Sequence, residues 1–413
     1  MTTHGPTGRA GDRWLAGGIV TGTLLAYVFQ LVGGRILGPE MFAPVSVLWT
    51  VMFLTGTIGL TPVEQYVARE STAGNRVLTR RSWAIGSVVL LTGAAAASFT
   101  GLTLDGLFLG EPGFVALAAL LVATTAPLFV ARGLAIGQRR FDLYGLMLAL
   151  EALGRLLVGA VGLLLVGGPV GLAWGIALGP ILALAVPTFG FERRAVRPAA
   201  PGAGAFLAPY IGASSASQLL LAGAPLAVAA LGAGPATISI VFVTFTLFRA
   251  PVTIVYLVQG RLLNVLVRLR IAGDRARIAR IRRRIELAGV AALLLAGVTG
   301  WLVGPSIVGL LFGSAFRPEP VVAALAATGV AGAGLAQLLG QLLVAEGRTA
   351  ALARRWAVGL AVAIVALTVG PLLGGLSPAV AVAAAFATGE VAAAAAMTRR
   401  SSAAPSEPQR PRE

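Results

Sequence analysis

Cysteine is absent from the 413-residue sequence, and the only histidine is His4. These absences exclude disulfide bonds and thiolate chemistry, and they leave almost no imidazole for metal binding. We therefore expect no metal site and no cofactor in this protein.

Charge is also scarce, since only 12% of the residues are charged whereas 57% are hydrophobic. The mean hydropathy is +0.87, which is too high for a soluble domain of this size. Uncharged runs recur that are long enough to cross a hydrocarbon core of about 30 Å as helices. Their Leu, Ala, Val and Gly residues do not alternate with polar ones, as those of a β-barrel would. The sequence therefore predicts an all-α, polytopic integral membrane protein.

Lysine is absent as well, so the 32 basic residues are all arginine, and they outnumber 16 acidic ones. In a soluble protein this imbalance would suggest nucleic-acid binding. Here every arginine except Arg35, Arg155, Arg249 and Arg317 lies near the N-terminus, in every second predicted loop or in the C-terminal tail, as the positive-inside rule requires. The pattern predicts contact with membrane lipid, no nucleic acid, two cytoplasmic termini and residence in the cell (inner or plasma) membrane. Nine arginines at residues 261–284 predict an amphipathic helix on the cytoplasmic surface.

Clusters of Gly and Pro divide the longest uncharged runs, which gives twelve predicted spans. Arginine alternates between the two sides along all twelve, and a missed or additional helix would have inverted the alternation from its position onward. The predicted spans are residues 14–32, 41–62, 82–103, 113–131, 142–166, 170–190, 206–230, 236–258, 285–312, 320–345, 353–373 and 377–397.

Two short motifs recur in the two halves of the chain. LGP at residues 37–39, after the first span, is similar to LGAGP at 231–235, after the seventh. LAIGQR at residues 134–139, after the fourth span, is similar to LVAEGR at 343–348, after the tenth. Such recurrence is expected of two parallel six-helix lobes with the same orientation.

We therefore predict five parts along the chain, divided by a proline-containing segment between the sixth and seventh spans. The parts are a cytoplasmic leader at residues 1–13, an N-terminal six-helix lobe at 14–190, a cytoplasmic inter-lobe linker at 191–205, a C-terminal six-helix lobe at 206–397 and a disordered cytoplasmic tail at 398–413.

Four segments resemble motifs of polysaccharide flippases. LGPEMFAPVSV at residues 37–47 is similar to LGPxxFGxxS after the first helix, and RGLAIGQRRF at 132–141 is similar to RGxLQGxxRF after the fourth. In the second half, LFGSAFR at 311–317 is similar to LFGxxYxxA, and LVAEGR at 343–348 is similar to LLAxGR. Over nearly its whole length the chain thus resembles the multidrug, oligosaccharidyl-lipid and polysaccharide (MOP) flippase superfamily, and its Wzx-type branch in particular.

The resemblance implies a MATE-like fold, in which a V-shaped pair of lobes surrounds a central cavity that opens alternately to the two sides of the membrane. The implied substrate is a polyprenyl-diphosphate-linked oligosaccharide, carried to the outer leaflet for cell-surface polysaccharide assembly. Other membrane proteins of polysaccharide assembly would be partners, and the chain is expected to be a monomer. Two departures distinguish it from related branches: two additional C-terminal helices are not predicted, and the first span has no carboxylate for cation coupling.

Glu151 and Arg155 lie one helical turn apart in the fifth predicted span, near the middle of the bilayer. A charge there costs about 2.5 to 3.5 kcal/mol on insertion scales, so both residues must face a cavity or a partner. Arg155 would contact the diphosphate while Glu151 tunes or releases it. The alternative is a self-neutralising pair that holds this helix against a neighbour.

Arg249 lies midway along the eighth predicted span, two residues before Pro251, which permits a kink. A guanidinium can bind a phosphate through two hydrogen bonds, so Arg249 favours a cavity that accepts anions. A salt bridge to Glu151, Glu286 or Glu390 is the alternative.

Four further residues complete the candidate site. Arg35, at the outer end of the first span, would guide a headgroup out of the cavity or simply extend to the membrane interface. Glu390 in the twelfth span, and Gln337 and Gln341 on one face of the tenth, would bind a proton, a cation or sugar hydroxyls, or else form hydrogen bonds between helices.

Three other functions remain as alternatives. A MATE-like exporter of cationic small molecules would need an acidic cavity, whereas Arg155 and Arg249 favour an anion. A membrane-embedded polysaccharide-assembly enzyme would need paired carboxylates, metal ligands or a large outer loop, and the acids of the predicted outer loops are isolated. A scaffold without transport activity would not need charges within its spans. The chain is therefore predicted to be a transporter without catalytic residues, not an enzyme.

Overall fold

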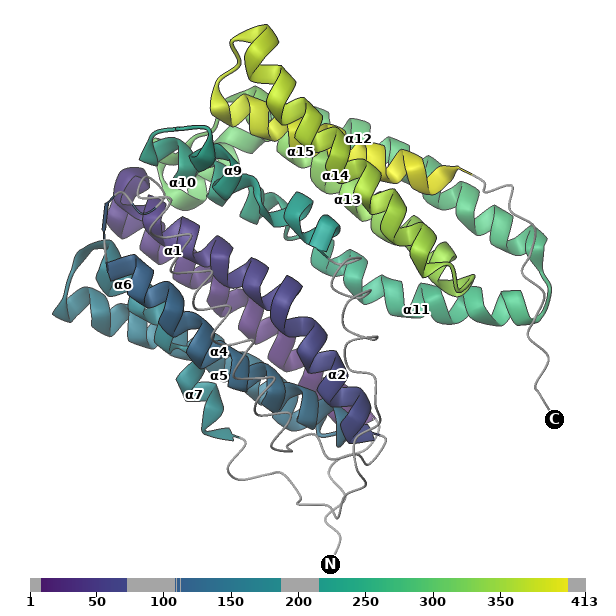
Figure 1. The fold of residues 1–413 in the computed structure, drawn as a ribbon, viewed down its shortest axis with the longest axis horizontal. Coiled ribbons are helices and arrows are strands. Elements are labelled where there is room, and N and C mark those ends of the chain that lie inside the picture. Colours follow the sequence, from purple (N-terminus) through teal and green to yellow (C-terminus); the bar gives the residue numbers. More distant parts are fainter. Residues whose placement is uncertain (1–8, 73–107, 109, 112, 187–214, 400–413) are drawn as a thin grey trace, which may run out of the picture.

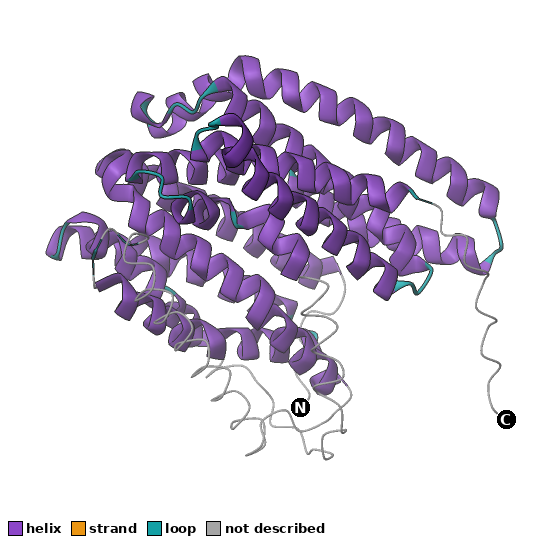
Figure 2. Cartoon of the chain, turned by 45° about the horizontal axis from the view of Figure 1, so that its top comes forward, coloured by secondary structure: helices purple, strands orange, loops and turns teal. Residues whose placement is uncertain are grey.

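A computed structural model describes residues 9–72, 108, 110–111, 113–186 and 215–399 of the chain. Most of these residues are helical, and none of them forms a strand (Figure 2). Seven helices in the described ranges are long and apolar enough to cross a membrane. The predicted all-α, polytopic membrane fold is confirmed.

Each predicted span except the third has helical residues at its position. The third span, the inter-lobe linker and the first residues of the seventh span lie outside the described residues, as do most of the leader and most of the tail.

Described residues up to 186 form a first bundle, at the lower left of Figure 1. Its longest helix turns back at Gly38, whose φ of 71° lies in the left-handed region that glycine adopts at little cost. The stacked rings of Phe29 and Trp49, with centroids 5.4 Å apart, show that the two arms lie side by side. The elements are α1 (Arg9–Leu54), a π-helical segment (Thr55–Leu60), α2 (Thr61–Thr72), α4 (Gly113–Gly137), α5 (Phe141–Leu165), α6 (Gly168–Leu178) and α7 (Pro180–Leu184).

Residues from 215 onward form a second bundle, at the upper right of Figure 1. It is built around α13, which contacts α10, α11, α12, α14 and α15. After a helical stretch at residues 215–222, its elements are α9 (Ala224–Ala230), α10 (Pro235–Phe248), α11 (Val252–Ile271), α12 (Arg275–Phe312), a 3-10 turn (Ser314–Phe316), α13 (Pro320–Ala345), α14 (Thr349–Gly374) and α15 (Pro378–Thr398).

The basic stretch at residues 261–284 does not form a separate surface helix, so that prediction is wrong. α11 continues to Ile271, and α12 begins at Arg275. Gly273, with φ of 72°, forms the turn between them. Because arginine tolerates helix well, α11 and α12 extend into this stretch from either side and meet in a short turn.

The turns that suggested an internal repeat have matching geometry. Gly232 has a φ of 75°, close to that of Gly38. At the ends of α4 and α13, Arg139 and Gly347 have φ of 58° and 71°. The next residue in each turn, Arg140 or Arg348, donates its N–H to the carbonyl five residues earlier, at 2.8 and 2.9 Å. The structure thus makes Arg140 the equivalent of Arg348, whereas the aligned motifs make Arg139 its equivalent.

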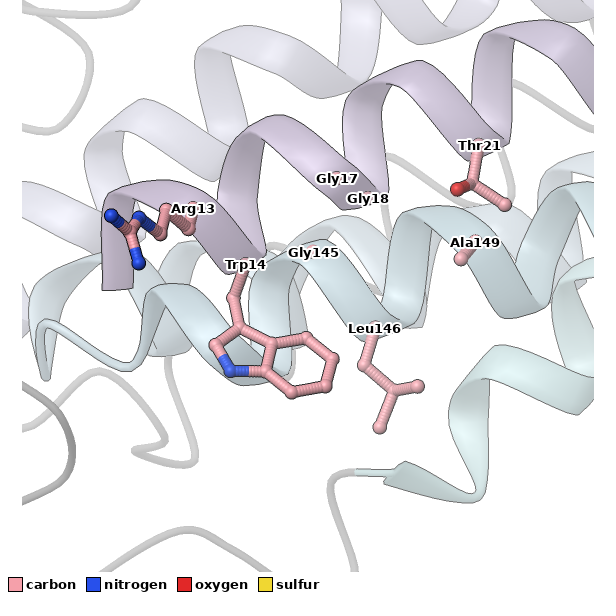
Figure 3. Close-up of a pocket in the computed structure, with 8 residues that line it drawn as sticks. All are labelled: Arg13, Trp14, Gly17, Gly18, Thr21, Gly145, Leu146 and Ala149. Carbon is pink, nitrogen blue, oxygen red and sulfur yellow. The ribbon is translucent and has the colours of Figure 1, made fainter. Parts of the chain in front are cut away.

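α1 and α5 cross at a point where glycines face each other. A Cβ at Gly18 would overlap the backbone of Gly145, and a Cβ at Gly145 would overlap the carbonyl oxygen of Trp14. Figure 3 shows Arg13 and Trp14 beside Gly145, around a groove of about 510 Å³. Arg and Trp side chains of this kind anchor helices at membrane interfaces.

We expect Gly145→Ala to lower the free energy of unfolding by about 1 to 3 kcal/mol, because two backbones meet there and neither can move alone. Gly17→Ala is the matched control, since a Cβ at Gly17 meets no atom within 4 Å. Thermal unfolding in detergent, followed by tryptophan fluorescence, compares the two variants. Equal midpoints would contradict the close contact.

Candidate functional site

A cavity of about 520 Å³ lies between the two bundles. Both arms of α1 line it, together with α4 and α5 of the first bundle and with α10 and α11 of the second. Among the described residues, three arginines contribute to the lining, Arg132, Arg155 and Arg249, against a single carboxylate, Glu151. The wall of this central cavity therefore carries excess positive charge.

Glu151 forms ion pairs with two arginines, Arg155 one turn later on α5 and Arg132 on the neighbouring α4. The side chains of Arg132 and Glu151 are each only 6% exposed, and that of Arg155 is 12% exposed. The Arg155 guanidinium also lies 5.5 Å from the centre of the Trp49 ring. The sequence-derived pair of Glu151 and Arg155 is thus present, but it is part of a cluster with a second cation.

Arg132 was assigned to a cytoplasmic loop by its sequence position, and that assignment is wrong. α4 extends to Gly137, six residues beyond the predicted end of the span. This extension carries the guanidinium into contact with Glu151 instead of leaving it in water.

Several polar atoms of the cavity wall lack a partner. The Nε atoms of Arg132 and Arg155 are buried without a hydrogen bond among the described residues, and so are the side-chain oxygens of Gln30 and Thr125. All four residues line the central cavity. Buried polar atoms are normally paired with protein or water, so these four atoms are exceptions among the described residues.

Arg249 lies at the break between α10 and α11. Pro251 has no N–H to offer, and the carbonyl of Leu247 instead accepts from the N–H of Ala250 at 3.1 Å. The Arg249 Cζ lies 4.4 Å from the centre of the Phe53 ring on α1, a cation–π contact between the two bundles. The break thus places the guanidinium in the wall of the central cavity, opposite the first bundle.

A second carboxylate, Glu64, which is not among the residues predicted from the sequence, lies behind the cavity wall. Tyr144 lines the central cavity, and its hydroxyl donates to Glu64 Oε1 at 3.1 Å. Glu64 is 4% exposed. Its position just beyond the predicted second span suggested a loop, whereas α2 continues the helix to Thr72. With Glu64 included, the described arginines around the cavity still outnumber the described carboxylates.

Arg35 lies outside the cavity, next to the turn at Gly38 and at the other end of the first arm of α1 from Arg13. Its Nε donates to the carbonyl oxygen of Leu311 at 2.6 Å, and its Nη2 donates to that of Leu310 at 2.5 Å. These carbonyls belong to the last turn of α12 in the second bundle, where the helix dipole also favours a cation. Arg35 therefore links the two bundles.

Aromatic side chains close the same end of the molecule. The ring of Phe42 on α1 lies 6.0 Å from that of Phe242 on α10 and 6.3 Å from that of Phe316. Phe312 lies 5.9 Å from Phe316. We call these four residues the aromatic seam.

The bundles diverge away from the aromatic seam. α1 contacts α9, α10 and α12 of the second bundle, whereas α2 and α11 lie apart in Figure 1. The diverging end carries Arg139, Arg270, Arg275 and Arg348, and the positive-inside rule places such an end in the cytoplasm. The two bundles are therefore in contact at the aromatic seam and apart at the arginine-rich end.

We expect Arg35→Met to weaken the contact at the seam. Loss of two partly exposed, charge-assisted hydrogen bonds should destabilise the closed seam by about 1 kcal/mol. The ratio of molecules closed at that end to molecules open there should then fall roughly fivefold. Because the chain has no cysteine, spin labels at Glu40→Cys and Ser314→Cys would report the separation of the bundles. Arg317→Met is the control at the same end, and identical distance distributions in both variants would contradict the linking role.

Glu390, Gln337 and Gln341 do not line the central cavity in the described structure. Glu390 is fully buried in the second bundle, with neither carboxylate oxygen hydrogen-bonded among the described residues. Gln337 accepts from Gln259 Nε2 at 3.1 Å and donates to Ser217 Oγ at 3.2 Å, so it connects three helices. Gln341, about one turn later on α13, is half-buried. The structure thus separates these three residues from the arginines.

No family model matches the chain, and no curated protein matches it. Among solved structures, an inward-facing multidrug resistance MATE family transporter of the MOP superfamily matches with a TM-score of 0.67 and 14% identity, over 91% of this chain and 92% of the other. The lipid II flippase MurJ, in an inward closed conformation, matches with a TM-score of 0.62 and 12% identity, over 91% of this chain and 86% of MurJ. A MOP superfamily transporter from Pyrococcus furiosus, described as having a binding pocket of reverse polarity, matches with a TM-score of 0.58 and 15% identity, over 93% and 92% of the two chains. The chain therefore has the fold of MOP superfamily transporters and flippases.

Proposed function

We propose that the chain is a flippase that carries a polyprenyl-diphosphate-linked oligosaccharide from the cytoplasmic to the outer leaflet. The observation that supports this proposal is the cationic lining of the central cavity, where Arg132, Arg155 and Arg249 outnumber Glu151. Guanidinium groups bind phosphate oxygens through paired hydrogen bonds.

Charge also suggests how substrate and conformation are coupled. Closing the cytoplasmic end on an empty cavity would bury the net positive charge of the cluster in which Arg132 and Arg155 share Glu151, which costs several kcal/mol. A bound diphosphate neutralises that charge, so it stabilises the occluded state more than the open one. A ligand with such a difference in affinity shifts a conformational equilibrium, and an empty carrier is then held inward-facing.

A MATE-like exporter of cationic small molecules is the weaker candidate. The same fold would serve it, but a cation entering the central cavity would meet three guanidinium groups and one carboxylate. In the cell membrane, the proposed flippase would work beside other membrane proteins of polysaccharide assembly.

The proposal is tested by reconstituting the purified protein into liposomes with a labelled polyprenyl-diphosphate oligosaccharide. Protein-dependent exposure of the sugar to a membrane-impermeant probe is the expected result, and liposomes without protein provide the background rate. If folded protein with the correct lipid produces no exposure, the exporter or the scaffold becomes the better assignment.

A further inference from the structure

A second cavity, of about 950 Å³, lies on the other side of the α10–α11 break. It is bounded by α10, α11, α12 and α13. Its lining is apolar apart from Arg284 at one end and Thr299, whose hydroxyl donates to the carbonyl of Leu295 at 2.7 Å. We call it the lateral groove. We propose that the lateral groove holds the isoprenoid chain of the lipid whose diphosphate occupies the central cavity, an inference that rests on the proposed function.

The length of the groove indicates which kind of chain it suits. Its lining on α12 runs from Arg284 to Ile307, roughly 35 Å at a helical rise of about 1.5 Å per residue. A hydrocarbon core is about 30 Å thick, so the groove crosses both leaflets. A phospholipid acyl chain reaches only through its own leaflet, whereas a long polyprenyl chain can follow the whole groove.

The groove and the central cavity share a wall. Val252 lines both spaces. At the helix break just before it, Phe248 and Pro251 line the groove, whereas Arg249 lines the central cavity. A lipid whose headgroup lies at Arg249 can therefore keep its chain against the other side of the same break. The two spaces are thus neighbours on opposite sides of one helix break, which places the headgroup and the chain of a single lipid within reach of both.

Charge and exposure allow such a lipid to enter. Arg284 lies at the arginine-rich end of the groove and is exposed, at the level where anionic headgroups of the cytoplasmic leaflet lie. Leu295, Val303 and Ile307 in the groove are 65%, 46% and 42% exposed. The groove is thus open toward the membrane along its side.

The expected gain in affinity is modest. Moving a hydrocarbon chain from lipid into an apolar groove gains no hydrophobic free energy, because lipid chains are as apolar as leucine. The groove acts instead by holding the chain beside the central cavity, which raises the local concentration of the headgroup there.

The test fills the groove with a side chain. Ala292 lines it, whereas the adjacent Ala291, also exposed on α12, is not part of its lining. With a long-chain polyprenyl diphosphate as the probe, measured by native mass spectrometry in detergent, Ala292→Phe should bind about tenfold more weakly than Ala291→Phe, which corresponds to about 1.4 kcal/mol. Inorganic diphosphate should bind equally to both variants. Ala288→Leu, a smaller change in the same groove, replaces Ala292→Phe if that variant does not fold.

Equal affinity of the two variants for polyprenyl diphosphate would overturn the proposal. The proposal would also be overturned if phosphatidylglycerol displaced the probe as effectively as unlabelled polyprenyl diphosphate does, because the groove would then hold ordinary membrane lipid. A polyprenol without diphosphate separates this inference from the proposed function. If Arg249→Ala leaves every affinity unchanged but Ala292→Phe still weakens polyprenol binding relative to Ala291→Phe, the groove is supported and the diphosphate site is not.

Discussion

Glu151→Gln is expected to lower the free energy of unfolding by about 3 to 5 kcal/mol, because it leaves two buried guanidinium groups without their counter-charge. Glu151 is 5% exposed, and both of its carboxylate oxygens are used, one by Arg132 and one by Arg155. A carboxamide keeps the shape of the side chain but removes its charge and offers only one oxygen as an acceptor. Thermal unfolding of the purified protein in detergent measures the change.

The matched control is Glu346→Gln. Glu346 is also paired with an arginine, Arg348, but at 3.4 Å and with side chains that are 45% and 34% exposed. Exposed pairs of this kind contribute less than about 1 kcal/mol. Similar losses in both variants would show that water screens the Glu151 cluster.

A double-mutant cycle tests the cause of the destabilisation. Adding Arg132→Gln to Glu151→Gln removes one of the two unneutralised charges, so it should recover part of the lost stability. The two substitutions would then be strongly non-additive, as contacting residues usually are. Additive losses would contradict the ion pairs seen in the structure.

The helices of this fold could be predicted because their signals are local. Hydropathy marks each apolar span, and arginine marks each second loop. The turn at Gly38 could also be predicted, since its LGP motif contains the residue that a left-handed φ requires. These features need no knowledge of which helices are neighbours.

The cluster around Glu151 could not be derived in this way. A charged residue ends an apolar run, so Arg132 and Glu64 were placed in loops although the helices continue past them. Their burial depends on contacts among α2, α4 and α5, which no single segment encodes. One signal was available: Gly133 and Gly137 lie one turn apart, and a Cβ at either would press into α2. Such spacing indicates that a helix continues and packs closely.

Arg249 illustrates the opposite case, in which local reasoning found a residue but not its surroundings. Pro251 in an apolar span predicts a kink, and the structure has a break there. The sequence offered Glu151, Glu286 and Glu390 as partners. The structure instead brings Phe53 of the other bundle to the guanidinium, because α1 and α10 are in contact across the molecule.

Arg249→Ala is expected to weaken binding of polyprenyl diphosphate by roughly 30- to 150-fold, or about 2 to 3 kcal/mol, the contribution of hydrogen bonds to a charged group. The affinity of Arg249→Lys should lie between those of the unmodified chain and Arg249→Ala, since lysine keeps the charge but loses the paired donors. Binding is measured on purified protein at a temperature at which each variant is folded. Arg317→Ala, at an exposed position outside the cavity lining, should bind as the unmodified chain does.

Arg249 is a sharper test of the cavity than Arg155. Arg155→Ala would remove a phosphate donor and at the same time a partner of Glu151, so its effects on binding and on stability would be mixed. Arg249 belongs to the second bundle, whereas Arg132 and Arg155 belong to the first. A diphosphate bound by arginines of both bundles would hold the bundles together. Arg249→Ala should therefore reduce the transport rate by a larger factor than it reduces the affinity. If Arg249→Ala is folded and still transports at the normal rate, the cationic cavity does not carry the substrate.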